Sequence, residues 1–121
     1  MDVRFTADHE WLAIDGTTAR VGITDHAQSL LGDLVFVELP SVGREVTRGS
    51  VVATVESVKA ASDVYAPLTG MIVEVNSPVV EDPSVVNSDP MGAGWLFTIR
   101  FHEPSELSGL LTEAEYLRQA K

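Results

Sequence analysis

The chain has 121 residues with 8 basic and 18 acidic side chains, a formal net charge of −10 and no cysteine. The missing cysteines exclude disulfides, cysteine-ligated metal sites and cysteine nucleophiles, and the negative charge argues against a nucleic-acid partner because it repels phosphates. This length predicts one domain, residues 1–121, with a core of its own. No apolar run approaches the roughly 20 residues of a membrane span. The first residues also lack a signal peptide, so we expect a cytoplasmic protein with no membrane partner.

The first part of the chain predicts a β-hairpin, a short helix and a strand. Asp15-Gly16 lies between two apolar runs, which is a strong hairpin signal. Thr24 can cap a short helix, and Gly32 is placed to end it. The strands expected here are residues 11–14, 19–23 and 34–39, the last of which is stopped by Pro40.

The rest of the chain predicts short strands rich in β-branched residues and a helical C-terminus. We expect strands at residues 51–56, 63–65, 71–75 and 95–101, and the last would put Trp95, Phe97, Ile99 and Phe101 on one face. Residues 78–90 are punctuated by prolines and predict a loop with at most one helical turn. Ser105 can cap a short helix through Leu111, and Thr112 with Glu115 predicts a capping box for a last helix.

Two segments echo one another at similar distances on either side of Lys59. Residues 42–46 and residues 69–73 each join a turn glycine to a β-rich run. The echo is short, and it suggests two similar half-sheets with the hairpin at Lys59 connecting them.

Lys59 is the one lysine inside the chain, because Lys121 is the last residue and the other basic residues are arginines. A lysine amine can be deprotonated and acylated, whereas a guanidinium stays charged. The neighbours Val58, Ala60 and Ala61 are small, so a hairpin would present the amine to a modifying enzyme. Acylation would create a long arm that raises the effective concentration of its cargo at a docked active site. The plainer interpretation is a solvated loop lysine, which most such lysines are.

Catalytic roles find less support in the sequence. A Schiff-base lysine needs burial in an apolar pocket, whereas Glu56 and Asp63 near Lys59 would favour the charged amine. The three histidines lack the spacing of a zinc site, and no nucleophile elbow, phosphate loop or dinucleotide fingerprint occurs. A triad assembled from distant residues stays open, but we expect no catalytic residue, no metal and no enzyme.

Several motifs in order along the chain resemble the glycine cleavage system H-protein family. Residues 55–63, Val-Glu-Ser-Val-Lys-Ala-Ala-Ser-Asp, resemble its lipoylation hairpin, and His9-Glu10-Trp11 resembles its opening strand. The other matching runs are residues 22–28, 31–40, 86–90, 94–96 and 104–107, together with Glu115-Tyr116. The resemblance therefore extends over nearly the whole chain.

The resemblance implies a mainly β fold, a lipoyl-domain-like barrel-sandwich hybrid of two small antiparallel sheets with short helices, some of them C-terminal. It implies a monomeric covalent carrier with lipoate in amide linkage on Lys59. The carrier would take the aminomethyl group of glycine from glycine decarboxylase (P protein) to an aminomethyltransferase (T protein). Dihydrolipoamide dehydrogenase (L protein) would reoxidise the arm, and lipoylating enzymes would attach it. Met1 lies almost at the family's first strand and leaves no room for an organelle leader, so we expect a bacterial cytoplasmic protein.

We expect carboxylates to cradle the loaded arm, whose amine is cationic near neutral pH and would lose ammonia prematurely in water. Opposite charges attract more strongly in a partly dry cleft than in bulk water. The candidates are Glu10 and Asp63, with Glu56 behind them. Hairpin hydrogen bonds and plain solubility explain each of these residues about equally well.

Rival functions stay open at this point. The chain could relay lipoyl groups to 2-oxoacid dehydrogenases, or it could be an interaction module in which Lys59 stays unmodified. Val58 and Ala60 stand where biotin carriers have methionines, which argues against biotin. Val58 also replaces the aspartate that is typical of the lipoyl domains of 2-oxoacid dehydrogenases.

Overall fold

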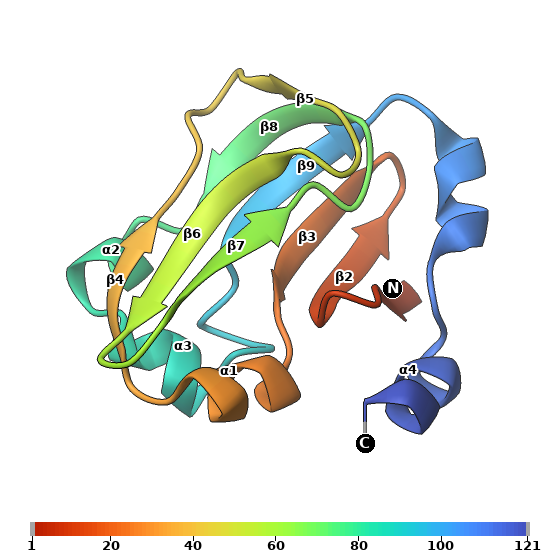
Figure 1. Ribbon diagram of the computed structural model, residues 1–121. Helices are drawn as coiled ribbons and strands as arrows, with labels where there is room; N and C mark the ends of the chain where they lie inside the picture. Colours follow the sequence, from red (N-terminus) through yellow and green to blue (C-terminus); the bar gives the residue numbers. More distant parts are fainter. Residues whose placement is uncertain (1, 121) are drawn as a thin grey trace.

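A computed structural model describes residues 2–120 and shows two antiparallel sheets packed face to face, with short helices at their ends (Figure 1). The larger sheet contains, in spatial order, β1 (Asp2–Phe5), β2 (Glu10–Asp15), β3 (Thr18–Ile23), β9 (Phe97–Phe101), β8 (Gly70–Val75) and β5 (Glu45–Val46). The smaller sheet contains β4 (Leu34–Glu38), β6 (Val51–Ser57) and β7 (Ala61–Tyr65). The predicted mainly β fold of two antiparallel sheets is confirmed.

The helices are short. They are α1 (Asp25–Leu31), α2 (Pro78–Glu81), α3 (Ser84–Ser88), the 3-10 helix η1 (Pro104–Gly109) and α4 (Glu113–Gln119). Thr24 caps α1 and Gly32 ends it, and the Thr112 capping box begins α4, all as predicted. No helix within residues 2–120 is long and apolar enough to cross a membrane.

The core lies between the two sheets and is built by strand alternation. Fully buried side chains from both layers belong to one cluster, including Leu12, Val21, Phe97 and Ile99 from the larger sheet and Val37, Val55 and Val64 from the smaller. Each such side chain contributes roughly 1.5–3 kcal/mol by leaving water. This shared core fixes the small sheet, and with it the hairpin that carries Lys59.

The expected pair of similar half-sheets is wrong. The two sheets have six and three strands, and the Lys59 hairpin joins β6 to β7 inside the smaller sheet. The echoing segments instead pair with each other in the larger sheet, where Glu45 lies opposite Met71 and Val46 opposite Gly70. Each segment is a short strand beside a turn, so the similarity reflects their antiparallel pairing and not a repeated unit.

Two predictions in the later part of the chain also need correction. Residues 78–90 contain the two helices α2 and α3, because Val79 and Val86 turn inward and are fully buried. Pro104, and not Ser105, begins the helix before α4, and that helix is of the 3-10 type and ends at Gly109. At the N-terminus, strand β1 lies outside the predicted elements and pairs with β2.

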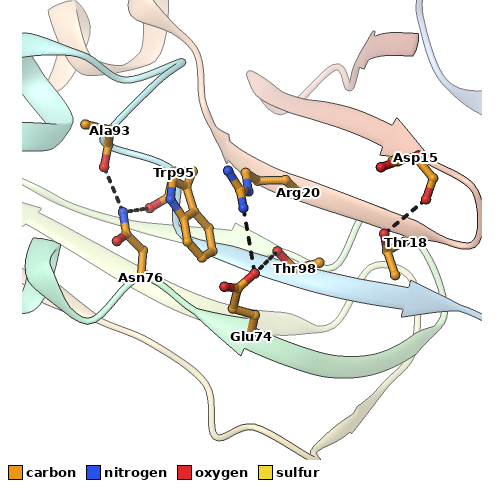
Figure 2. Close-up of polar contacts among 8 residues, drawn as sticks. All are labelled: Asp15, Thr18, Arg20, Glu74, Asn76, Ala93, Trp95 and Thr98. Carbon is orange, nitrogen blue, oxygen red and sulfur yellow. Dashed lines mark hydrogen bonds and ion pairs between the residues drawn. The ribbon is translucent and has the colours of Figure 1, made fainter. Parts of the chain in front are cut away.

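Trp95 does not share the core face of Phe97, because β9 begins only after it. The Asn76 amide donates to the carbonyl oxygens of Ala93 (2.8 Å) and Trp95 (2.6 Å), which holds this segment away from the strand (Figure 2). The Trp95 ring instead packs beneath the Arg20 guanidinium, 4.3 Å from it, on the outer face of the larger sheet. Arg20 also lies 3.7 Å from the Glu74 carboxylate, so a polar row crosses this face.

Candidate functional site

Lys59 lies in the tight link between β6 and β7, residues 58–60. The Ser57 backbone N–H donates to the Ala60 carbonyl (2.7 Å), and the Ser57 hydroxyl accepts from the N–H groups of Lys59 (3.2 Å) and Ala60 (3.1 Å). Serine side chains commonly close turns in this way. Ser57 thus fixes the backbone of the link, while Lys59 and its neighbour Val58, 75% exposed, face solvent.

The loop that follows α1 packs against the hairpin. The Val58 N–H donates to the Asp33 carbonyl at 3.3 Å. Gly32 has φ +84°, and a Cβ added there would lie 3.4 Å from Cε of Lys59 and 3.9 Å from its Nζ. The lysine side chain therefore lies over Gly32, where the positive φ favours glycine and an added Cβ would make only an ordinary van der Waals contact.

Asn87, in α3, holds that supporting loop in place. Its Oδ1 accepts from the Leu34 N–H (2.9 Å), and its Nδ2 donates to the Gly32 carbonyl (2.9 Å) and to Oε1 of Gln28 (2.9 Å). One side chain thus joins α1, the loop and the start of β4, because an amide offers both donors and an acceptor. The position of Lys59 depends on this contact across the fold.

Glu10 is a buried carboxylate, 2% exposed, at the start of β2. Its Oε2 accepts from the Tyr65 N–H (2.7 Å) at the end of β7, and its Oε1 accepts from the Thr6 hydroxyl (3.1 Å). Burial raises the pKa of Glu10 from 4.5 to about 7, against the two hydrogen bonds, which act to lower it. The carboxyl therefore changes its charge close to neutral pH.

A solvent-open cavity of about 420 Å³ lies at Glu10. The residues that line it include Thr6, Asp8, Glu10, Arg48, Tyr65 and Leu110. Strand β7 runs from the hairpin toward β2 (Figure 1), and Tyr65 at its end is the residue that contacts Glu10. One strand therefore connects Lys59 with the cavity. The wall beside Leu110 is fixed by Glu106 of η1, whose carboxylate accepts from the Thr69 N–H at 2.7 Å.

The other two predicted cradle residues lie on the outer face of the small sheet. Asp63 faces Thr54 across the strands, with Oγ1 of Thr54 at 3.5 Å from Oδ1 of Asp63, and Glu56 faces Ala61. Asp63 lies on β7 between Lys59 and the cavity, whereas Glu56 lies one strand away. Neither is among the described residues that line the cavity.

The histidines lie elsewhere. Nδ1 of His9 is 2.7 Å from the Tyr116 hydroxyl in α4, the His26 ring lies 4.7 Å from the His9 ring, and Nε2 of His102 is 3.0 Å from Glu45. Burial lowers the pKa of His9, with the neighbouring His26 acting in the same direction. These contacts tie α4 and a loop to the sheet, and no histidine is among the described residues that line the cavity at Glu10.

Sequence reasoning missed the polar residues that position the site. Thr6, Ser57 and Asn87 were not among the predicted site residues, although Thr6 holds Glu10 and Ser57 holds Lys59, both of which were. Gly32 was predicted only as a helix end, and that role is confirmed. A glycine following a helix gives no sequence signal that a lysine from a distant hairpin lies over it.

The likeness to known proteins extends over the whole site. A family model described as "Glycine cleavage H-protein" matches residues 3–121. The chain is 56% identical over 112 residues to a glycine cleavage system H protein of Bradyrhizobium diazoefficiens, covering 93% of this chain and 92% of that protein. It also matches the crystal structure of a glycine cleavage system H protein from Mycobacterium marinum with a TM-score of 0.87 and 46% identity, covering 98% of this chain and 95% of that one.

Proposed function

The chain belongs to the glycine cleavage H-protein family and is a lipoyl carrier of the glycine cleavage system, and from this premise we propose that Lys59 is the residue that bears the lipoyl group. The observation that supports this most is the placement of Lys59 in a fixed, exposed link between β6 and β7. An amine presented in this way is accessible to a modifying enzyme. Its attached arm could then enter partner active sites without unfolding the carrier.

The lipoyl group, once attached, supplies the disulfide that accepts and releases the aminomethyl group of glycine. The residues of this chain hold and orient the lysine that carries this group. Ser57 fixes the link, Asn87 fixes the loop beneath it, and Gly32 supplies the positive φ with which that loop begins. We propose that the protein has no catalytic residue of its own and that the chemistry belongs to its partners.

The cavity at Glu10 suits the cationic amine of a loaded arm. A lipoyl-lysine side chain has about eleven bonds from Cα to the dithiolane, which reach ~14 Å. From Lys59 to Tyr65 the strand covers ~20 Å at about 3.3 Å per residue. The opened dithiolane and its aminomethyl group would add about five more bonds, ~6 Å. An arm laid along β7 would therefore pass Asp63 and bring its amine toward Glu10, where an ionised carboxylate would attract it strongly because the site is partly dry.

The partners follow from the same proposal. They are glycine decarboxylase, which loads the arm, the aminomethyltransferase, which unloads it, dihydrolipoamide dehydrogenase, which reoxidises it, and the lipoylating enzymes. The excess of 18 acidic over 8 basic residues favours transient docking on basic surfaces. We propose that these encounters occur in a bacterial cytoplasm.

Glycine–bicarbonate exchange with glycine decarboxylase tests the role of Lys59. The Lys59→Arg variant keeps the positive charge and removes the acylable amine, so we expect exchange to fall to background. Lys121→Arg is the matched control, because it changes the one other lysine of the chain, and it should keep wild-type exchange. Wild-type exchange by the Lys59→Arg variant would contradict the proposal.

A second experiment tests the cradle. The double variant Glu10→Gln with Asp63→Asn should release ammonia faster from the loaded arm in the absence of the aminomethyltransferase, because the cavity loses the carboxylate of Glu10 and its approach loses that of Asp63. Glu81→Gln, at an exposed position of α2, removes one acid elsewhere and should leave the rate unchanged. Equal rates in the double variant and the wild type would exclude this role for Glu10 and Asp63.

A further inference from the structure

Strand β4 exposes two consecutive apolar side chains next to the Lys59 hairpin. Its pairing with β6 is shifted between Leu34 and Phe36, so the strand does not simply alternate between buried and exposed residues. Val35 is 57% exposed and Phe36 46% exposed as a result. A bulge of this kind re-aims side chains and often lies beside a functional site. Neither side chain contributes to the buried core.

Two further exposed apolar residues lie around the same lysine. Val58 precedes Lys59, and Leu30, in the last turn of α1, is 59% exposed and lies two residues before Gly32. The hydrogen bond from Val58 to Asp33 joins the hairpin to the α1–β4 loop, and the strand register places Leu34 opposite Ser57 and Phe36 opposite Glu56. We call Leu30, Val35, Phe36 and Val58 the lysine-side patch. Single exposed apolar residues are ordinary, whereas several around one reactive amine indicate a contact surface.

We propose that the lysine-side patch is the surface on which the enzyme that attaches lipoate docks, an inference that rests on Lys59 being the lipoylated residue. That enzyme must bring its active site to the Nζ atom itself, so its surface has to cover the residues around the lysine. Enzymes that act on the far end of a ~14 Å arm can work at a distance from this patch. The residues closest to Lys59 therefore suit the attaching enzyme best.

The acidic residues around the patch indicate the charge of the enzyme surface that would bind it. Asp33, Glu38 and Asp63 are exposed near the patch or on the same sheet face, and none of them forms an ion pair within residues 2–120. The matching enzyme surface has an apolar centre, which receives Val35 and Phe36, and a rim of lysine and arginine residues. Apolar contacts in the middle of an interface provide most of its affinity, and the charged rim speeds encounter.

The reaction at this surface is an acyl transfer with an activated lipoyl ester or mixed anhydride held by the enzyme. The deprotonated Nζ of Lys59 attacks the lipoyl carbonyl carbon, the N–C bond forms, and the bond to the activating group breaks. The activating group leaves with the electron pair, and the ammonium proton passes to solvent or a base on the enzyme. The patch takes no part in these bond changes; it brings Lys59, and not Lys121, to the activated carbonyl.

Matched valine variants test the proposal. Val35→Ser changes the patch, and Val42→Ser changes a valine that is 60% exposed outside it, between β4 and β5. With unmodified protein, a lipoate–protein ligase, ATP and lipoate, we expect Val35→Ser to lower kcat/KM of lipoylation about five- to tenfold, through KM. Val42→Ser should stay within about twofold of wild type. Phe36→Ser is the second patch variant, and thermal unfolding should show both patch variants folded.

Glycine–bicarbonate exchange shows whether the patch serves the lipoylating enzyme or the decarboxylase. Fully lipoylated Val35→Ser protein should support glycine–bicarbonate exchange like the wild type, and an equal loss in that assay would assign the patch to the decarboxylase and overturn the proposal. Lipoylation of both patch variants at the rate of Val42→Ser would also overturn it, while leaving Lys59 as the modified residue. If the wild type itself gained no lipoyl group, the proposed function would fail first.

Discussion

Replacing Glu10 by glutamine should remove a pH dependence that this buried carboxyl imposes on the stability of the protein. The folded state raises the pKa of Glu10 from 4.5 to about 7, chiefly because the carboxyl is buried. Between these two values the folded protein holds a proton that the unfolded chain releases. The favourable contribution is therefore fully present below pH 4.5 and is lost as the pH rises through about 7.

The magnitude follows from the two pKa values. Each unit of difference corresponds to about 1.4 kcal/mol, so a rise from 4.5 to about 7 lowers the free energy of unfolding by roughly 3 kcal/mol once the carboxyl is ionised. Glutamine has nearly the same shape, can still accept from the Tyr65 N–H, and carries no charge at any pH. The difference in unfolding free energy, Glu10→Gln minus wild type, should grow by about that amount between pH 4.5 and about pH 8.

Urea unfolding followed by tryptophan fluorescence at several pH values measures this difference directly. Val42→Ser is the control, because it changes an exposed side chain that does not titrate and leaves Glu10 in place, so its difference from the wild type should stay nearly constant over the same range. If the wild type and Glu10→Gln changed in parallel with pH, Glu10 would not be held in its protonated form. The idea that the cavity gains its negative charge near neutral pH would then have to be abandoned.

Three further predictions concern residues that support the site and the fold around it. Gly32→Ala and Gly43→Ala should each cost about 1–2 kcal/mol in urea unfolding, because both positions have positive φ; an unchanged unfolding free energy in either variant would refute that strain. Asn87→Ala should lower the unfolding free energy by about 2–3 kcal/mol, and Asn87→Asp by at least as much, because the oxygen that replaces Nδ2 would face the acceptor oxygens of Gly32 and Gln28; a clearly smaller loss in the aspartate variant would contradict the assigned bonds. Tyr116→Phe loses two hydrogen bonds but keeps its ring stacking, so its free energy of unfolding should fall by about 1–2 kcal/mol and its melting temperature should fall with it. An unchanged melting temperature would show that the hydroxyl contributes nothing to stability.

The features that could be predicted from the sequence are those decided by neighbouring residues. Thr24 caps α1 and Gly32 ends it, and Thr112 with Glu115 begins α4, because each of these arrangements involves residues within one helical turn of the boundary. The strands on either side of Lys59 follow equally from their β-branched residues. For the same reason the local pattern of residues is enough to place Lys59 in a hairpin link.

The features that could not be predicted depend on pairs far apart in the chain. Glu10 reaches the N–H of Tyr65, and Asn87 reaches the loop at Gly32, each across more than fifty residues. Alternation along a strand says which residues face inward, but it does not say which strand becomes the neighbour. That is why the division into unequal sheets was missed, and why Glu10 could be nominated as an acid without its burial being foreseen.

Peptide mapping by mass spectrometry tests the central claim most directly. The protein is produced together with a competent lipoate–protein ligase in cells supplied with lipoate, digested, and each lysine-containing peptide is weighed and fragmented. The account predicts one lipoyl group, in amide linkage, on the peptide that contains Lys59, and an unmodified Lys121. A free amine at Lys59 in material made under these conditions would contradict it.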